Sequence, residues 1–182
     1  MPDTLTLAQR HANMAAIHSA STKPELLLRK SLWRLGFRYR VNDKRLPGKP
    51  DIVLPKFRTV IFVHGCFWHG HKDCSNYTVP KTNTEFWMAK IARNQERDQE
   101  TWRKLEAKGW YVLIVWECEL KKARFDDTLN YVAFAIKQNG QTYDLLQAAR
   151  KKSRALYAEE RKLHKEHEAA MRSEIRDKFP HR

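Results

Sequence analysis

The sequence of 182 residues has no long hydrophobic run, only three cysteines and a shortage of acidic residues. Its longest apolar stretch, residues 110–116, is far shorter than the roughly 20 residues that cross a bilayer. The N-terminus lacks a basic stretch followed by an apolar one, so we expect neither a signal peptide nor a membrane partner. Because 42% of the residues are hydrophobic, the chain can bury a core, which excludes wholesale disorder. These features predict a cytoplasmic globular protein.

The shortage of acidic residues leaves 35 Lys and Arg against 21 Asp and Glu, a formal net charge of +14. Residues 1–140 hold 24 basic and 14 acidic residues, and residues 141–182 hold 11 and 7. The excess charge therefore belongs mainly to the first part of the chain. It predicts a polyanionic partner, with nucleic acid first and an anionic membrane surface well behind. We expect a globular domain over residues 1–140 and a charged helical extension over residues 141–182, whose role the sequence does not reveal.

Hydrophobic periodicity predicts an α/β fold with a mixed central sheet flanked by helices. Thr22 and Glu25 form a capping box that begins a helix, and Gly36 ends it. Thr84 is the expected N-cap of a long second helix. The predicted elements are helices over 23–35, 85–108, 126–138 and from 143 onward, and strands over 37–41, 51–54, 58–63 and 110–116, of which the second and third form a hairpin.

The three cysteines and one histidine form a potential metal-ligand set. Cys66, His71 and Cys74 crowd into one predicted loop, and Cys118 follows the last predicted strand. Four such ligands predict a structural zinc held tetrahedrally with no open position. A disulfide is disfavoured in a reducing compartment, and three cysteines would leave one unpaired. The alternative is that the cysteines are buried small apolar residues, which explains Cys118 well but the crowding in the loop poorly.

A carboxylate and two imidazoles are the candidates for catalysis. Asp51 opens one hairpin strand and His64 ends the other, which is the layout of PD-(D/E)xK nucleases. In those enzymes an acid holds Mg²⁺ against the scissile phosphate, but here Phe62 replaces the second acid and His64 the lysine. His64 and His69 are not needed by the zinc set, and we expect pKa values near neutrality for proton transfer. Alternatively, both histidines are only neighbours of the metal loop.

Other polar and aromatic residues have two interpretations each. Glu25 is either a helix cap or an acid that holds a metal-bound water. Asn94 and Asp98 fall on the inward face of the long helix, where unpartnered polar groups cost about 1–3 kcal/mol, so we expect them to brace the His-rich loop. Large aromatics in a basic loop can wedge between base steps or stack on bases. Phe67 and Trp68 fit this role, and Trp87 is equally consistent with core packing.

A set of ordered motifs over about residues 5–138 resembles the very short patch repair endonucleases. Members of that family nick DNA 5′ of a thymine mispaired with guanine, a lesion left by deamination of 5-methylcytosine. The resemblance implies a restriction-endonuclease-like (PD-(D/E)xK variant) core, one structural zinc and catalytic Mg²⁺. The motifs are Asn13-Met14, Pro47-Gly48-Lys49-Pro50-Asp51, His64-Gly65-Cys66-Phe67-Trp68-His69, Thr84-Glu85-Phe86-Trp87, Asn94 with Arg97-Asp98, and Val115-Trp116-Glu117-Cys118.

The resemblance also implies roles for individual residues. Asp51 would bind Mg²⁺ directly, as would the backbone carbonyl of Val63, while Glu25 and His64 act through metal-bound waters. His69 would be the general base or acid at the scissile phosphate. Phe67, Trp68 and Trp87 would intercalate into DNA, helped by Met14, and Cys66, His71, Cys74 and Cys118 would hold zinc.

The implied partner is double-stranded DNA with a T:G mismatch, and downstream repair proteins would follow. We expect a monomer that acts on the nucleoid in the cytoplasm of a prokaryote. Two other functions remain open at this point. One is a restriction-type endonuclease that cuts intact duplex, and the other is a zinc-stabilised DNA-binding module without activity.

Overall fold

A computed structural model describes the backbone of residue 9 and of residues 20–178, and the side chains of residue 9 and residues 20–168. Met14, a predicted DNA contact, lies outside the described residues. The chain divides into two compact units, residues 1–140 and residues 141–182.

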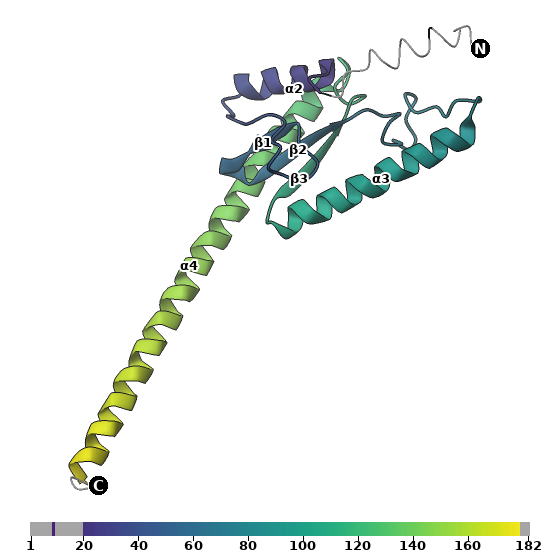
Figure 1. Ribbon diagram of the computed structural model, residues 1–182. Helices are drawn as coiled ribbons and strands as arrows, with labels where there is room; N and C mark the ends of the chain where they lie inside the picture. The colour runs from purple at the N-terminus through teal and green to yellow at the C-terminus, as the bar shows by residue number, and fades with distance from the viewer. Residues whose placement is uncertain (1–8, 10–19, 179–182) are drawn as a thin grey trace. The chain divides into compact units, whose positions relative to one another are not determined.

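The first unit is built on a mixed sheet of three strands (Figure 1). Strand β1 (Ile52–Leu54) is antiparallel to β2 (Thr59–His64), and a short 3-10 turn, η1 (Pro55–Phe57), joins them. Strand β3 (Tyr111–Trp116) pairs with β2 in parallel, so its connection crosses over through a helix. The predicted hairpin and the mixed sheet are therefore confirmed.

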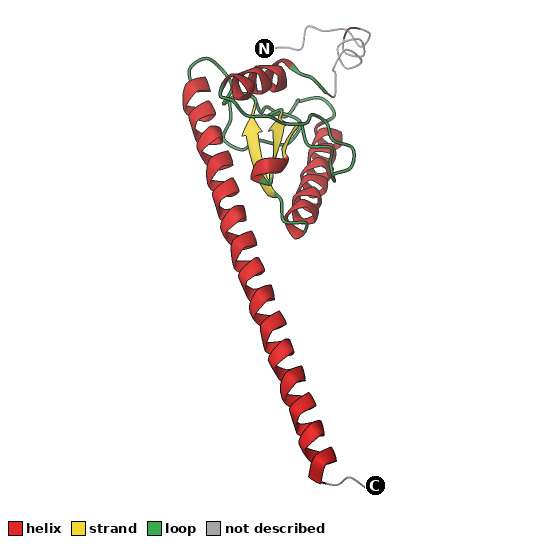
Figure 2. Cartoon of the chain, turned by 90° about the vertical axis from the view of Figure 1, so that its left-hand side faces the viewer, coloured by secondary structure: helices red, strands yellow, loops and turns green. Residues whose placement is uncertain are grey.

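Helices cover both faces of this sheet, as Figure 2 shows. Ile52, Leu54 and Ile61 point to one face, where they pack with Leu28 of α2 (Lys23–Arg34) and with Ile136 of α4 (Phe125–Lys178). The intervening residues point to the other face and pack against α3 (Thr84–Ala107). That second group comprises Val53, Val60 and Phe62 of the sheet, with Leu105 of the helix. Period-two alternation thus builds two cores.

Helix α2 confirms the predicted capping box but not the strand predicted after it. Gly36 ends the helix in the left-handed region (φ 87°), and the N–H of Phe37 donates to the Leu32 carbonyl at 3.0 Å. Phe37 therefore belongs to the helix terminus. Within residues 37–41 only Arg40 pairs with β1, through an isolated bridge to Val53. The strand predicted over 37–41 is wrong.

Helix α3 begins one residue earlier than predicted. Its N-cap is Asn83, in the left-handed region at φ 53°, a conformation that asparagine tolerates better than most residues. The hydroxyl of Thr84 donates instead to the carbonyl of Pro80 at 2.9 Å. Thr84 is therefore the first residue of the helix and not its cap.

Helix α4 joins the two helices predicted over 126–138 and from 143 onward. Gly140, which separates them in the sequence, lies inside the helix, where a Cβ would come within 2.7 Å of Cδ1 of Phe57. Glycine here permits close packing and does not end the helix. In the second unit, residues 144–168 of α4 are exposed. Among the described residues, no helix is both long and apolar enough to span a bilayer.

Candidate active site

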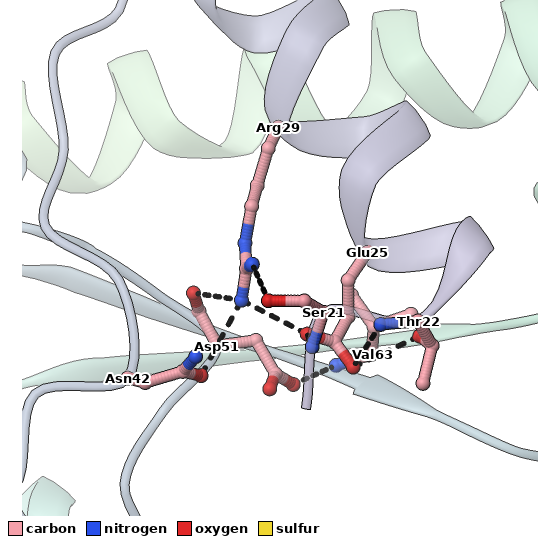
Figure 3. Close-up of polar contacts among 7 residues, drawn as sticks. All are labelled: Ser21, Thr22, Glu25, Arg29, Asn42, Asp51 and Val63. Carbon is pink, nitrogen blue, oxygen red and sulfur yellow. Dashed lines mark hydrogen bonds and ion pairs between the residues drawn. The ribbon is translucent and has the colours of Figure 1, made fainter. Parts of the chain in front are cut away.

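Asp51 lies directly before β1 and reaches across to β2 (Figure 3). Its Oδ2 accepts a hydrogen bond from the N–H of Val63 at 2.8 Å. Strand β1 begins at Ile52, which pairs with Ile61, so Val63 has no partner in β1. Since the N–H and C=O of one strand residue point to the same side, the Val63 carbonyl also faces Asp51. The two oxygen ligands predicted for Mg²⁺ thus lie on one side of the sheet edge.

Burial raises the pKa of Asp51 to about 6, and the nearby Glu25 contributes to the rise, while the hydrogen bond from Val63 opposes it. A buried carboxylate with a raised pKa is stabilised in its ionised form by a neighbouring cation. Mg²⁺ prefers such oxygen ligands and keeps several waters. The donor set around Asp51 therefore fits a divalent cation of this kind.

Arg29, which is not among the site residues predicted from the sequence, links the two predicted acids (Figure 3). Its Nη2 donates to Oε2 of Glu25 at 2.9 Å, to the backbone carbonyl of Asp51 at 3.0 Å and to Oδ1 of Asn42 at 3.3 Å. Its Nη1 donates to Oγ of Ser21 at 3.4 Å. The buried guanidinium therefore ties the first turn of α2 to the start of β1. The available signal was its position four residues after Glu25 on the helix.

The Glu25 side chain caps the N-terminus of α2. Oε2 accepts from the N–H of Ser21 at 2.9 Å, and Oε1 accepts from the hydroxyl of Thr22 at 2.9 Å. With Arg29 as a further donor, the buried carboxylate is well supplied with hydrogen bonds. This arrangement confirms the cap interpretation.

His64, His69 and Asp98 come together beside this edge of the sheet, with one potential ligand atom from each within 4.8 Å of the others. The two imidazoles stack with centroids 3.7 Å apart, and Nδ1 of His69 contacts Oδ2 of Asp98. Burial raises the pKa of Asp98, but the hydrogen bond with His69 and its charge lower the pKa below the usual value. Asp98 therefore fixes the orientation of His69.

His64 is nearly buried, and its ring packs edge-on against Trp116 with centroids 5.4 Å apart. Burial, followed by the charge of His69, lowers the pKa of His64 to about 3. The near-neutral pKa expected from the sequence is therefore wrong for His64, which is a neutral imidazole. Its Nδ1 is buried and has no hydrogen-bond partner among the described residues. Such an orphaned atom fits a water or ligand.

The inward-facing polar residues of α3 brace the His-rich loop, as predicted. Nδ2 of Asn94 donates to the carbonyl of Trp68 at 2.9 Å, and Asp98 contacts His69. Gln95, which the sequence did not single out, donates to the carbonyl of His69 at 3.2 Å. Gly70 has φ 63°, and a Cβ there would lie 2.5 Å from Nε2 of Gln95. The loop therefore packs too closely on α3 for a side chain at Gly70.

The predicted metal ligands also converge. The ligand atoms of Cys66, His71, Cys74 and Cys118 all lie within 4.8 Å of one another. Nδ1 of His71 is 3.4 Å from the Sγ atoms of both Cys66 and Cys118. A tetrahedral zinc would place such nitrogen and sulfur atoms about 3.6 Å apart. The imidazole also stacks on Trp116 at 4.1 Å, which holds the ring in place. The four residues thus form a potential metal site that fits zinc.

Aromatic residues of the loop and of α3 form a third cluster. Phe67 packs edge-on against Trp68 at 5.2 Å and Trp87 at 5.3 Å between centroids. All three are only partly buried. Phe86 extends the cluster and is 54% exposed, and Nζ of Lys90 lies 5.6 Å from the Trp68 ring. The structure therefore brings Phe67, Trp68 and Trp87 together, and places Phe86 and Lys90 beside them.

Known proteins resemble this chain over most of its length. The family model described as DNA mismatch endonuclease Vsr matches residues 2–76. The Type II nicking enzyme V.NmeAIP of Neisseria meningitidis serogroup A is 53% identical over 138 residues, which cover 75% of this chain and 98% of that relative. DNA mismatch endonuclease Vsr of Escherichia coli K12 is 48% identical over 121 residues, 66% of this chain and 77% of the relative. A nicking enzyme of Xanthomonas oryzae, V.XorIIP, is 46% identical over 120 residues, with 88% of its length covered.

The fold, the acidic and histidine site and these similarities together define a DNA endonuclease, a hydrolase of phosphodiester bonds. Within that class, the chain belongs to the Vsr family of DNA mismatch endonucleases.

Proposed function

We propose that this endonuclease nicks one strand of duplex DNA, 5′ of the thymine in a T:G mismatch that arises from deaminated 5-methylcytosine. The proposal is carried by one observation: a buried carboxylate and a cluster of two imidazoles with a second carboxylate lie close together at one edge of the sheet. The Asp51 carboxylate accepts a hydrogen bond from the N–H of Val63 there, and the His64–His69–Asp98 cluster includes the last residue of β2. The mixed sheet between helices supports a restriction-endonuclease-like core in residues 1–140.

Mg²⁺ is the proposed catalytic cofactor, held by the carboxylate of Asp51 and the backbone carbonyl of Val63. When bound, it would stabilise negative charge on the scissile phosphate as a Lewis acid. Glu25 and the neutral imidazole of His64 would position water at this site. Arg29 would keep Glu25 and Asp51 in place, since its guanidinium contacts both.

His69 is the proposed proton-transfer residue. Asp98 occupies Nδ1 of its ring, which leaves Nε2 for the substrate. A carboxylate in this position fixes the tautomer of an imidazole and stabilises its protonated form. His69 can thus take a proton from the attacking water or give one to the leaving oxygen. Asn94 supports the loop from behind, through the carbonyl of Trp68.

Structural zinc at Cys66, His71, Cys74 and Cys118 would fix the ends of the loop that carries His69 and Trp68. Zinc ligation of this type supplies folding free energy to segments without regular structure. Phe67, Trp68 and Trp87 would then wedge into the base stack at the mismatch, where unstacking costs least. Met14 is included in this proposal from the sequence alone. A single-strand nick needs one site, so we propose a monomer that works on nucleoid DNA in the cytoplasm and passes its product to repair proteins.

The experiment compares two duplexes that differ only in carrying T·G or T·A at one position, in the presence of Mg²⁺. We expect nicking of the T strand of the mismatch alone. Cutting of the paired duplex would instead support a restriction-type enzyme, and binding without cleavage a DNA-binding module. Asp51→Ala should abolish nicking but spare binding, whereas the exposed Asp127→Ala should change neither.

The mismatch preference needs a second test. Trp68→Ala should reduce the preference for T·G over T·A, because the wedge loses its largest ring. Trp33→Ala removes a tryptophan of α2 that is 52% exposed and serves as the control. An unchanged preference in Trp68→Ala would assign that side chain to packing within the aromatic cluster.

A further inference from the structure

The part of α4 in the second unit carries its positive charges in an ordered pattern. Arg150, Arg154, Arg161 and Lys165 follow one another at intervals of four, seven and four residues. At about 100° per residue, this spacing places all four within an arc of about 60° on the helix. The same intervals continue in the sequence to Arg172 and Arg176. We call the four residues from Arg150 to Lys165 the cationic stripe; it extends over about 22 Å of helix.

The cationic stripe is available to a ligand. All four side chains are exposed, and none makes an ion pair with another residue that the structure describes. Neighbouring charges behave differently, because Lys162 pairs with Glu166 at 3.7 Å and His164 with Glu168 at 3.3 Å. Among the described acids of residues 141–168, only Glu168 has a helical position within the arc of the stripe. Its carboxylate is already paired with His164.

The pattern fits a chain of phosphates better than a membrane. Leu156 and Leu163 lie on the opposite side of the helix, roughly 180° from the stripe. The acidic residues Glu159, Glu160 and Glu166 all lie within about 80° of these leucines, alongside Lys152 and His167. A helix that inserted these leucines into an anionic bilayer would press its acids onto the head groups. Duplex DNA instead offers about one negative charge per 1.7 Å of axis, so about 13 lie along the length of the stripe.

We propose that the cationic stripe is a DNA-contacting arm, which adds affinity for duplex phosphates independently of sequence. This inference rests on the proposed function only for the identity of the polyanion. The arm is an addition to the nuclease unit. The alignment with the Neisseria relative covers 98% of that protein in 138 residues, about the length of residues 1–140 alone.

The test measures binding of the full chain to a fully paired duplex without divalent metal, so that neither a mismatch nor cleavage is involved. The variant carries Arg150→Gln, Arg154→Gln, Arg161→Gln and Lys165→Gln, which preserve helix propensity. Each phosphate contact contributes about 0.9 to the slope of log K against log salt, so the slope should fall by about 2 to 4. At about 100 mM salt, binding should weaken by about tenfold or more. An unchanged slope and affinity would overturn the proposal.

Two double variants distinguish an effect of the positions of the stripe charges from an effect of the total charge of the helix. Arg154→Gln with Arg161→Gln removes two stripe charges, and Lys152→Gln with Lys162→Gln removes two charges from elsewhere on the same helix. We expect a slope change of about 2 for the first pair and less than about 1 for the second. Equal effects of both pairs, at equal helix content by circular dichroism, would refute a stripe.

The proposed nicking activity and the proposed DNA-contacting arm can fail independently of each other. If the wild-type chain fails to nick T·G duplexes while the stripe still controls duplex binding, the proposed function fails and the arm stands. If the wild-type chain nicks T·G and the stripe variants bind normally, the arm fails and the function stands. Stripe-dependent binding to phosphatidylglycerol vesicles, with unchanged DNA binding, would overturn the DNA assignment in favour of a membrane.

Discussion

Replacement of Arg29 by methionine should destabilise the first unit more than any surface change on the same helix. The side chains of Arg29 and Glu25 are only 8% and 4% exposed, and their ion pair measures 2.9 Å. Removing one partner of a buried pair leaves an uncompensated charge, which costs about 3–5 kcal/mol. Here Ser21 and Thr22 still donate to Glu25, so we expect the lower end, about 3 kcal/mol.

Urea unfolding followed by circular dichroism measures this loss, at constant metal content. For a chain of this size, about 3 kcal/mol corresponds to a fall in Tm of about 6–12 °C. Lys30→Met, which removes the adjacent exposed cation, is the control and should stay within about 0.5 kcal/mol. Arg29→Lys should lie between the two, because an ammonium keeps the charge but not the planar fork that reaches Glu25, Asp51 and Asn42.

A double-mutant cycle decides whether the unpaired charge is the cause. Glu25→Gln removes the charge that Arg29→Met would strand, so the double variant should be less destabilised than the sum of the singles by about 1–2 kcal/mol. Effects that add within about 0.5 kcal/mol would refute the reasoning and leave only lost packing of the arginine stem.

Three further changes test other parts of the structure. Cys118→Ser should abolish near-stoichiometric zinc in metal analysis and lower Tm, because the fourth ligand closes the site on the sheet; retained zinc would exclude Cys118 as a ligand. Asp98→Asn should lower the nicking rate by about 10- to 1,000-fold without weakening DNA binding, because His69 loses its carboxylate. The exposed Glu96→Gln on the same helix should have little effect, and equal rates in the two variants would refute the pairing. Gly140→Ala should lower the free energy of unfolding by about 1 kcal/mol despite better helix propensity, since the new methyl meets Phe57 at 2.7 Å; a gain of about 1 kcal/mol would show that the ring moves freely.

Local chemistry explains why much of the fold was predictable. The capping box of Thr22 and Glu25, the hairpin over residues 51–63 and the apolar run that ends at Trp116 each carry their signal within a few residues. The failures occurred where tertiary packing decides. Residues 37–41 alternate like a strand, but β1 offers only three residues for pairing, and Phe37 is held by the helix terminus. The helices predicted over 126–138 and from 143 onward form one helix, in which Gly140 packs against Phe57.

The site shows the same division. Asp51, His64, His69 and the four cysteine and histidine ligands stand out by residue type and spacing, and the structure places them as two adjacent clusters and a metal-ligand set. Arg29 and Lys90 do not stand out, because exposed arginines and lysines are common on helices and neither burial nor an aromatic neighbour is visible in a sequence. The pKa of His64 was also beyond reach, since it depends on the rings that enclose the imidazole.

The sequence by itself determined the three strands that form the sheet, the types of residue that can bind metal, and the excess of positive charge. These follow from side-chain periodicity and from chemistry that each residue carries alone. Only the tertiary structure decided that Asp98 orients His69 and that Arg29 links Glu25 to Asp51. Each of these contacts joins side chains whose distance and burial arise when helices pack on both faces of the sheet.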